Sequence, residues 1–504
     1  MNHYSFLRLS LSRLLTVIVF IAIFTMAVRV PADTDTWWHL RSGQYIVETR
    51  SIPTTDPFSH TRGGQLWIDH GWLAQVFWYG LFALGGWAGL SLGLAALVTC
   101  AFGLVWQVTP GNLYVRAFSI ILGAITSAVI WVARPQMVSF LLAGLVLLLL
   151  ERYKRAGWRW VYAMPLVALL WSNVHGGYAI ALMLLAAYVV GETFNRLTGH
   201  SDDPVLSWRQ IGTLIGVAVV SFAVVAINPH GWQMWIYPFR TVGIGALRDY
   251  IQEWRSPNFH LTMTWPFVVM LMLTLAAMGR APRRTDWTDL ALVGMWAGWS
   301  LFAARNIGIF GLVIIPALAR YADASWGHYL PAREKSSTNQ RMAFIRLNWL
   351  LLGLVALAAL VKIGVALAPS AVAQAEKALP CGAVRFIQAE GLPGPMFNSY
   401  NWGGYLIWHL YPDYPVFIDG RTDLYDDEFI REYVKVTLAK PGWREVLDHY
   451  EVNFILIESD SILAAFLAEG DEWQSVYDDA IATVFLRNTP ENQDILFKLL
   501  GSRQ

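Results

Sequence analysis

The stretch "LLTVIVFIAIFTMAVRVPADTDTWWHLRSG", Leu14 to Gly43, joins a long apolar run to a polar segment that holds two acids and two tryptophans. The run over 14–30 approaches the length that crosses a bilayer, and Arg8 and Arg13 precede it. No small-x-small cleavage site stands before the polar segment. We therefore expect an uncleaved first span with its basic flank in the cytoplasm.

The composition extends this interpretation to the whole chain. Of 504 residues, 56% are hydrophobic and 14% are charged, and the mean hydropathy is +0.42. These values predict a polytopic α-helical membrane protein and argue against a soluble fold. The formal net charge of +1 provides no basic field, so we expect no nucleic-acid partner. Two cysteines, Cys100 and Cys381, indicate neither a disulfide framework nor a cysteine-based metal site.

Apolar runs of near-spanning length recur as far as Ala368. About eleven are predicted spans, although some are shorter than the norm of roughly 20 residues. The predicted spans are 14–30, 87–107, 117–133, 136–151, 160–173, 177–193, 211–227, 264–279, 288–304, 307–320 and 347–368. The fold class is therefore predicted to be mainly α.

The segment "HGWLAQVFWYGLFALGG", residues 70–86, decides the orientation. It is apolar and aromatic, but it is short for a span. If it crossed the membrane, the basic cluster 151–159 would face outward, whereas an interfacial helix leaves this cluster inside. The positive-inside rule favours the interfacial helix. We therefore expect a multi-pass protein of the cytoplasmic (inner) membrane, with a cytoplasmic N-terminus and an outer loop over 31–86.

From about residue 370 the composition changes to that of a soluble domain of roughly 130 residues. The predicted domains are therefore a transmembrane domain over 1–369 and an extracytoplasmic domain over 370–504. Within the second, the patterns predict strands over 395–400, 415–420 and 453–459, helices over 381–391, 426–436 and 444–450, and a hairpin over 473–488. This alternation indicates an α/β domain.

The acidic pair Asp33 and Asp35 has two interpretations. Asp35 is predicted to cap a helix that begins near Thr36. However, two carboxylates this close to a membrane repel each other unless something holds them. One of them would then act as a general base toward an acceptor hydroxyl, or Asp33 and Asp35 would together hold a divalent cation against a phosphate.

The residues that follow the acids also have predicted roles. Trp37 and Trp38 are expected to anchor the membrane interface. His39 lies one helical turn after Asp35 and is placed to pair with it.

Further polar segments lie at the predicted outer helix ends, at 133–136, 171–177, 228–232 and 304–306. Arg134 and Arg305 stand among apolar residues there, where a guanidinium needs an anionic partner. That partner is either the Asp33 and Asp35 pair or the phosphate of a lipid carrier. His175, His230 and Asn306 in these segments are candidate substrate-binding groups. In the tail, Asp419 and Arg421 are expected to form an ion pair within a turn.

The order of the first elements resembles the amino-terminal module of GT-C glycosyltransferases, which use polyprenyl-phosphate-linked sugars. That module has a first span, an acidic pair, an outer loop, an aromatic interfacial helix and a second span. The corresponding segments here would be "DTD" (33–35), "DHGWLAQVFWYG" (69–80) and "LFALGG" (81–86). The Lys-Pro-Pro of the mannosyltransferase branch is replaced by Asp69-His70-Gly71. The resemblance implies the base role for Asp33 or Asp35.

Together these features predict an integral membrane glycosyltransferase. A sugar would move from a polyprenyl-phosphate carrier to a glycan, lipid or protein acceptor on the outer face of the membrane. One alternative is a transporter or flippase for a lipid-linked glycan. Buried charges in the middle of the spans would favour this alternative, and almost none are expected there. The other is a non-catalytic assembly subunit of a cell-envelope glycan system, whose tail binds a partner.

Overall fold

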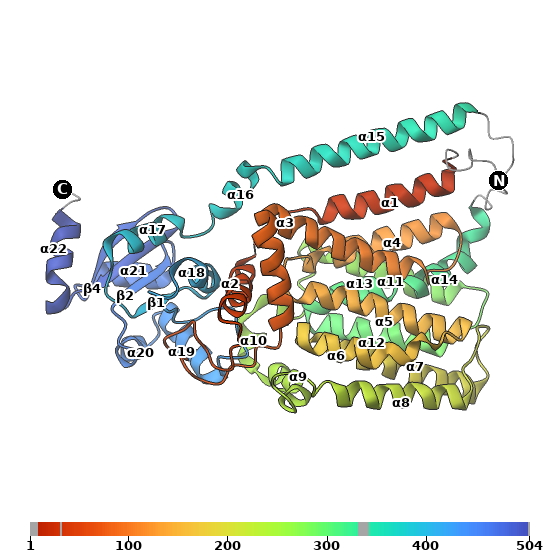
Figure 1. Ribbon diagram of the computed structural model, residues 1–504, viewed down its shortest axis with the longest axis horizontal. Coiled ribbons are helices and arrows are strands. Elements are labelled where there is room, and N and C mark those ends of the chain that lie inside the picture. The colour runs from red at the N-terminus through yellow and green to blue at the C-terminus, as the bar shows by residue number, and fades with distance from the viewer. Residues whose placement is uncertain (1–8, 31–32, 331–341, 502–504) are drawn as a thin grey trace. The chain divides into compact units, whose positions relative to one another are not determined.

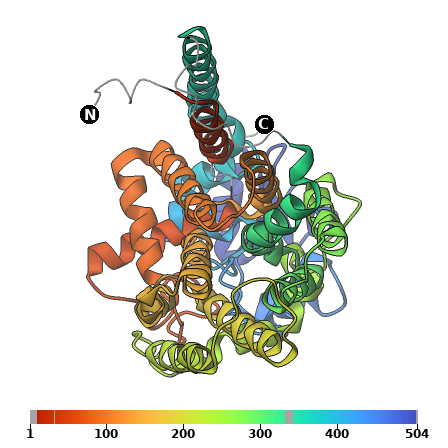
Figure 2. The same ribbon diagram turned by 90° about the vertical axis from the view of Figure 1, so that its right-hand side faces the viewer.

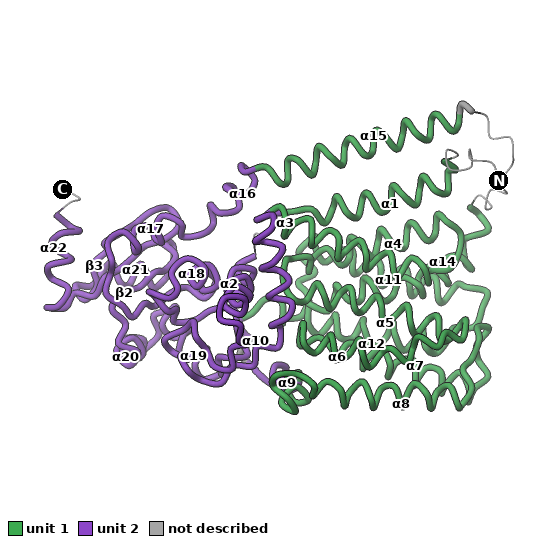
Figure 3. The backbone as a smooth tube through the Cα atoms, viewed as in Figure 1, with its two compact units in different colours: residues 1–29, 88–238, 251–368 green, residues 30–87, 239–250, 369–504 purple. Residues whose placement is uncertain are grey.

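The computed structural model describes residues 9–30, 33–330 and 342–501, and the chain divides into two compact units (Figure 3). Unit 1 comprises Met1–Arg29, Ala88–Pro238 and Ile251–Ala368, and unit 2 comprises Val30–Trp87, Phe239–Tyr250 and Pro369–Gln504. Unit 2 therefore combines the predicted outer loop with the predicted C-terminal domain.

Unit 1 is built from helices that run roughly along one direction (Figures 1 and 2). They are α1 (Leu11–Ala27), the second part of α3 (Trp72–Trp106), α4 (Leu113–Ser127), α5 (Gln136–Ala156), α6 (Met164–Val174), α7 (Ala179–Thr198), α8 (Trp208–Val224), α11 (Trp265–Arg280), α12 (Trp287–Phe302), α13 (Ile307–Val313), α14 (Ile315–Trp326) and α15 (Met342–Ala366). Helix α9 (Gln233–Gly243) contains residues of both units.

The predicted spans all coincide with helical segments. Among the described residues, six helices are long and apolar enough to cross a membrane, or seven if the pair bent by 54° between Val313 and Ile315 forms one span. Helices α1 and α8 are apolar but shorter. The chain is thus a mainly helical, multi-pass membrane protein.

Gly86 interrupts α3 at the boundary that the sequence predicts between the aromatic segment and the second span. Its backbone angles, φ 54° and ψ −141°, are not helical, and a positive φ carries little steric cost only for glycine. Trp87 is the last residue of this part of unit 2, and Ala88 is the first of the following segment of unit 1. A single glycine therefore separates the predicted interfacial helix from the span.

Unit 2 contains a four-stranded sheet in the order β1-β2-β4-β3. The pair β1–β2 is parallel, while β2–β4 and the hairpin β3–β4 are antiparallel. The strands are β1 (Met396–Asn398), β2 (Phe454–Glu458), β3 (Trp473–Asp478) and β4 (Ala482–Arg487). The helices are α2 (Thr34–Thr49), the first part of α3, α10 (Gly245–Tyr250), α16 (Pro369–Glu376), α17 (Cys381–Glu390), α18 (Gly403–Leu410), α19 (Asp427–Thr437), α20 (Trp443–His449), α21 (Ile462–Glu469) and α22 (Gln493–Gly501).

The predicted strand over 415–420 is wrong, because its backbone bonds to the backbone of the outer loop and to the side chain of Asn398, and not to the backbone of a neighbouring strand. Val416 N donates to Phe58 O, and His60 N donates to Val416 O, both at 3.0 Å. The segment forms only an isolated bridge, between Ser59 and Val416. The outer loop therefore takes the place of a strand partner for the tail.

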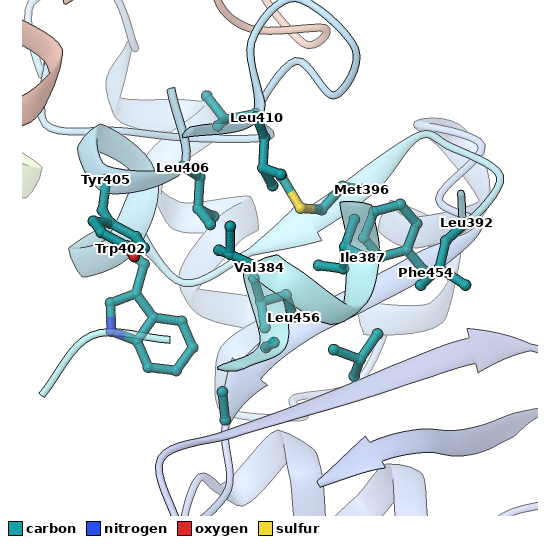
Figure 4. Packing of buried hydrophobic residues seen from close by; sticks show 14 of the residues in the cluster. Val384, Ile387, Leu392, Met396, Trp402, Tyr405, Leu406, Leu410, Phe454 and Leu456 are labelled. Atoms are coloured by element: carbon teal, nitrogen blue, oxygen red, sulfur yellow. The ribbon is translucent and has the colours of Figure 1, made fainter. Parts of the chain in front are cut away.

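The outer loop also contributes to the hydrophobic core of unit 2. Figure 4 shows part of that core, in which Val384, Leu406 and Leu456 pack together. Trp37 and Trp38 belong to the same cluster and are only 5% and 6% exposed. The ring of Trp37 meets that of Tyr405 edge to face, with centroids 5.1 Å apart. The prediction that these tryptophans anchor the membrane interface is therefore wrong, because α2 packs on α18.

Candidate functional site

The two acids at the start of α2, Asp33 and Asp35, have different roles in the helix. Helix α2 begins at Thr34, and Asp33 is its N-cap, with a carboxylate that accepts a hydrogen bond from the backbone N of Asp35 at 2.9 Å. The prediction that Asp35 caps a helix beginning near Thr36 is therefore wrong. Capping belongs to Asp33, whose extended backbone is typical of this position.

The carboxylate of Asp35 lies against Gly420 of the tail. A Cβ placed on Gly420 would come within 1.9 Å of Asp35 Oδ1, and one on Gly404 would come within 2.4 Å of the carbonyl oxygen of Thr34. These glycines allow the first turn of α2 to approach the tail at backbone distance. The half-buried Asp35 is thus held where the outer loop meets the tail.

Gly420→Ala tests this contact. The added methyl group must displace the Asp35 carboxylate, so we expect a loss of about 1–3 kcal/mol in the free energy of unfolding. In an Asp35→Ala background the same change should cost much less, because the clashing oxygen is gone. Thermal unfolding of the four proteins measures this difference. Gly470→Ala, at a glycine with open space around it, is the control, and equal losses at both glycines would contradict the contact.

Arg421, the next residue of the tail, is buried between two aspartates. Its Nη2 lies 2.6 Å from Asp419 Oδ2, and its Nη1 pairs with Asp56, 365 residues away in the chain. Burial alone would raise the pKa of Asp56, but Arg421 and hydrogen bonds from Ser59 and Phe58 hold it below its ordinary value. The predicted pair of Asp419 and Arg421 is confirmed, while Asp56 was missed. This cluster ties the outer loop to the tail.

Asp69 is a second acid that the sequence interpretation missed. It is 2% exposed, and its Oδ1 accepts a hydrogen bond from Gln75 Nε2 at 2.7 Å. Burial raises the pKa of Asp69 to about 7, against the opposing hydrogen bonds from Gln75 and Gly71, and the charge of Asp423 adds to the increase. Asp69 is therefore partly protonated near neutral pH.

The titration of Asp69 predicts a pH-dependent stability. Its pKa of about 7 in the folded protein exceeds the ordinary 3.8, so the protonated form contributes stability that is complete below about pH 3.8 and is lost as the pH rises through 7. The Asp69→Asn variant stays neutral at every pH. The unfolding temperature of this variant minus that of the wild type should therefore increase as the pH is raised from about 4.5 to 8. Exposed Glu48→Gln serves as the control. A constant difference between Asp69→Asn and wild type across this range would contradict the shift.

His39 lies in the same unit, on α2. It is 8% exposed, and its ring packs on that of Trp38 with centroids 3.6 Å apart. The imidazole is therefore largely buried and lies against the indole ring of Trp38.

Arg134 and Arg305, both in unit 1, reach the same carboxylate. Arg134 Nη1 lies 3.8 Å from one oxygen of Glu253, and Arg305 Nη1 lies 3.8 Å from the other. The Arg305 guanidinium also lies 4.2 Å from the ring centroid of Trp254, and the backbone N of Ala304 donates to Arg255 O. Glu253 was missed because the loop after α10 has no pattern that marks it. Unit 1 thus holds an anion-binding arrangement of two arginines.

The other predicted residues of unit 1 make contacts at helix ends. His175 Nδ1 lies 2.8 Å from Ser139 Oγ and accepts a hydrogen bond from Gly177 N. The backbone N of His230 donates to Asn228 Oδ1, and Asn306 Nδ2 donates to Trp299 O. These contacts shape the turns around the helix ends.

A divalent cation at Asp33 and Asp35 is one of the roles predicted for these acids. Within residues 9–30, 33–330 and 342–501, no three His, Cys, Asp or Glu side chains come together as a metal site.

Comparisons with known proteins support the fold. No protein-family model matches the chain, and no curated protein sequence matches it. Among solved structures, oligosaccharyltransferase AglB from Archaeoglobus fulgidus, in complex with an inhibitory peptide and a dolichol-phosphate, matches at 13% identity with a TM-score of 0.54. The match covers 88% of this chain and 69% of AglB.

Two other structures have the same architecture. ArnT from Cupriavidus metallidurans in the apo state matches at 13% identity and a TM-score of 0.52, over 93% of this chain and 97% of ArnT. Arabinofuranosyltransferase AftD from Mycobacteria matches at 12% identity and a TM-score of 0.51, over 96% of this chain and 40% of AftD. All three are polytopic glycosyltransferases of the GT-C superfamily, so this chain has the GT-C fold that its sequence resembles.

Proposed function

We propose that this membrane protein is a glycosyltransferase that moves a sugar from a polyprenyl-phosphate carrier to a glycan, lipid or protein acceptor on the outer face of the cytoplasmic membrane. The arrangement of Arg134 and Arg305 around one carboxylate carries the proposal. Guanidinium groups suit the bidentate binding of phosphate. Further support comes from the GT-C fold, because AglB was solved with a dolichol-phosphate.

The proposed reaction is a direct displacement at the anomeric carbon. Asp35 takes the proton of the acceptor hydroxyl, whose oxygen forms the new bond to the sugar. The bond between the anomeric carbon and the phosphate oxygen breaks, and the polyprenyl phosphate leaves with the electron pair. Arg134 and Arg305 stabilise its negative charge. Asp35 is assigned as the base in preference to Asp33, because the carboxylate of Asp33 caps α2.

Glu253 occupies the position proposed for the phosphate, so its charge competes with the carrier. Glu253→Gln is expected to tighten the binding of undecaprenyl phosphate several-fold, while Arg134→Gln and Arg305→Gln each weaken it about tenfold or more. Binding of the labelled lipid to the purified full chain in detergent measures these effects. Exposed Arg209→Gln is the control. Wild-type affinity in both arginine variants would contradict the proposed phosphate site.

A transporter or flippase for a lipid-linked glycan is the second candidate, because the helices of unit 1 contain buried charges. Buried charged residues are Glu151 and Lys154 in α5, Glu192 in α7, Asp289 in α12 and Arg320 in α14. These charges lie near the ends of the predicted spans, and the prediction that the middle of the spans holds almost no charges is not contradicted by them. Vesicles containing the protein and a labelled polyprenyl-phosphate sugar separate the candidates. Transfer of the label to an acceptor supports the enzyme, and movement of the intact lipid across the bilayer supports the transporter.

A further inference from the structure

Helices α1 and α15 of unit 1 run side by side in the same direction (Figures 1 and 2). At one end Asn348 Nδ2 donates to Leu9 O at 2.8 Å, and at the other Lys362 Nζ donates to the carbonyl oxygens of Thr25 and Val28. None of the most apolar 18-residue window of α15 is buried within the described part of the protein. This helix therefore presents most of its surface to the membrane.

A groove of about 320 Å³ lies between the two helices. This volume is at the lower end of the range of roughly 300–1,000 Å³ that is typical of small-molecule sites. Its walls are mainly apolar, with Ile21, Ala22 and Met26 from α1 and Val355 and Ala358 from α15, and Lys362 lies at one end. The groove thus has apolar side chains along its walls and a positively charged side chain at one end.

A second cation, Arg29, lies close enough to Lys362 for their charges to interact unfavourably. Arg29 Nη1 donates to Ala128 O at 3.3 Å, and its guanidinium lies 5.5 Å from the ring centroid of Trp131. Within the described residues, the hydrogen-bond acceptors of both cations are neutral carbonyl oxygens, and neither cation forms an ion pair. Two neighbouring cations beside apolar spans are costly unless an anion compensates them.

We propose that this groove binds an anionic membrane phospholipid, with its phosphate at Lys362 and Arg29 and an acyl chain along the apolar walls. Basic pockets between membrane helices recognise anionic headgroups in this way. A bulk phospholipid is the proposed occupant, because the groove shares no residue with the arginines around Glu253, where the sugar carrier is proposed to bind. The proposal is independent of glycosyl transfer, since it uses neither Asp35 nor the arginines around Glu253.

Native mass spectrometry of the purified full chain tests the proposal with added phosphatidylglycerol or phosphatidylcholine. The wild type is expected to retain one phosphatidylglycerol at least about tenfold better than phosphatidylcholine. The double variant Arg29→Gln/Lys362→Gln should lose this preference. A matched control, Arg13→Gln/Arg346→Gln, removes exposed charges from the same two helices and should behave like the wild type.

A further variant separates lost binding from lost folding. Ala358→Phe fills the groove but keeps both cations, so it should also reduce phosphatidylglycerol retention while the unfolding temperature stays close to the wild-type value. Equal retention of both lipids by the wild type would overturn the proposal, as would undiminished retention in Ala358→Phe or in the double variant. Retention of undecaprenyl phosphate without phosphatidylglycerol would also overturn it, by assigning the groove to the carrier.

Discussion

Asp35→Asn is expected to lower the rate of sugar transfer by about 10²–10⁴-fold, because an amide cannot take the proton of the acceptor hydroxyl. Asp33→Asn should retain most of the activity. Asp33 accepts a hydrogen bond from the backbone N of Asp35, and asparagine caps helices about as well as aspartate does. Because Asp33 caps α2, we expect the transfer rate to depend strongly on the carboxylate of Asp35 and only weakly on that of Asp33.

The measurement uses a panel of radiolabelled polyprenyl-phosphate sugars with membranes that contain each variant at equal protein level. Transfer of label from lipid to acceptor is counted, and the unfolding temperature shows that each variant is folded. Full activity in Asp35→Asn would refute the base assignment. Equal losses in both variants would instead show that the first turn of α2 matters as a whole, and would refute the separation of the two roles.

Lys154→Met is expected to destabilise unit 1 by about 3–5 kcal/mol, since it leaves buried carboxylates without a counter-charge. Lys154 Nζ lies 2.5 Å from Glu192 Oε1 and 2.8 Å from Asp286 Oδ2, and the side chains are at most 1% exposed. The neighbouring Arg320 is similarly paired with Glu151 and Asp289. Removal of the Lys154 ammonium therefore leaves the buried carboxylates of Glu192 and Asp286 without the positive charge that they contact.

Thermal and denaturant unfolding in detergent measure this loss. Arg196→Met, an exposed cation of α7, is the matched control and should change the free energy of unfolding by no more than about 0.5 kcal/mol. Adding Glu192→Gln to Lys154→Met removes one of the stranded charges and should restore part of the stability. Similar small losses for Lys154→Met and Arg196→Met would show that the buried charges are screened or neutral.

Local patterns allowed much of the fold to be predicted. Long apolar runs indicated the helices of unit 1, and two strand-like segments with the turn at Asp478 and Asp479 between them indicated the closing hairpin. The glycines at the end of the aromatic segment 70–86 indicated where α3 is interrupted, at Gly86. The segment 415–420 misled the prediction, because its strand-like composition reflects burial against the outer loop.

Some of the candidate functional residues could also be recognised from local sequence patterns, and others could not. Arg134 and Arg305 were recognisable as charges among apolar neighbours, but their common partner Glu253 lies in a loop with no periodicity. The burial of Asp69 likewise depends on packing that a short polar segment does not reveal.

By itself, the sequence determined the helical membrane class, the α/β character of the tail and the acidic start of α2, because hydrophobic length, alternation and capping act between near neighbours. Only the tertiary structure decided that the outer loop and the tail form one unit. Asp35 lies against Gly420, and Arg421 pairs with Asp56. These contacts join residues hundreds of positions apart, and their energies depend on close approach and exclusion of water, which no local pattern records.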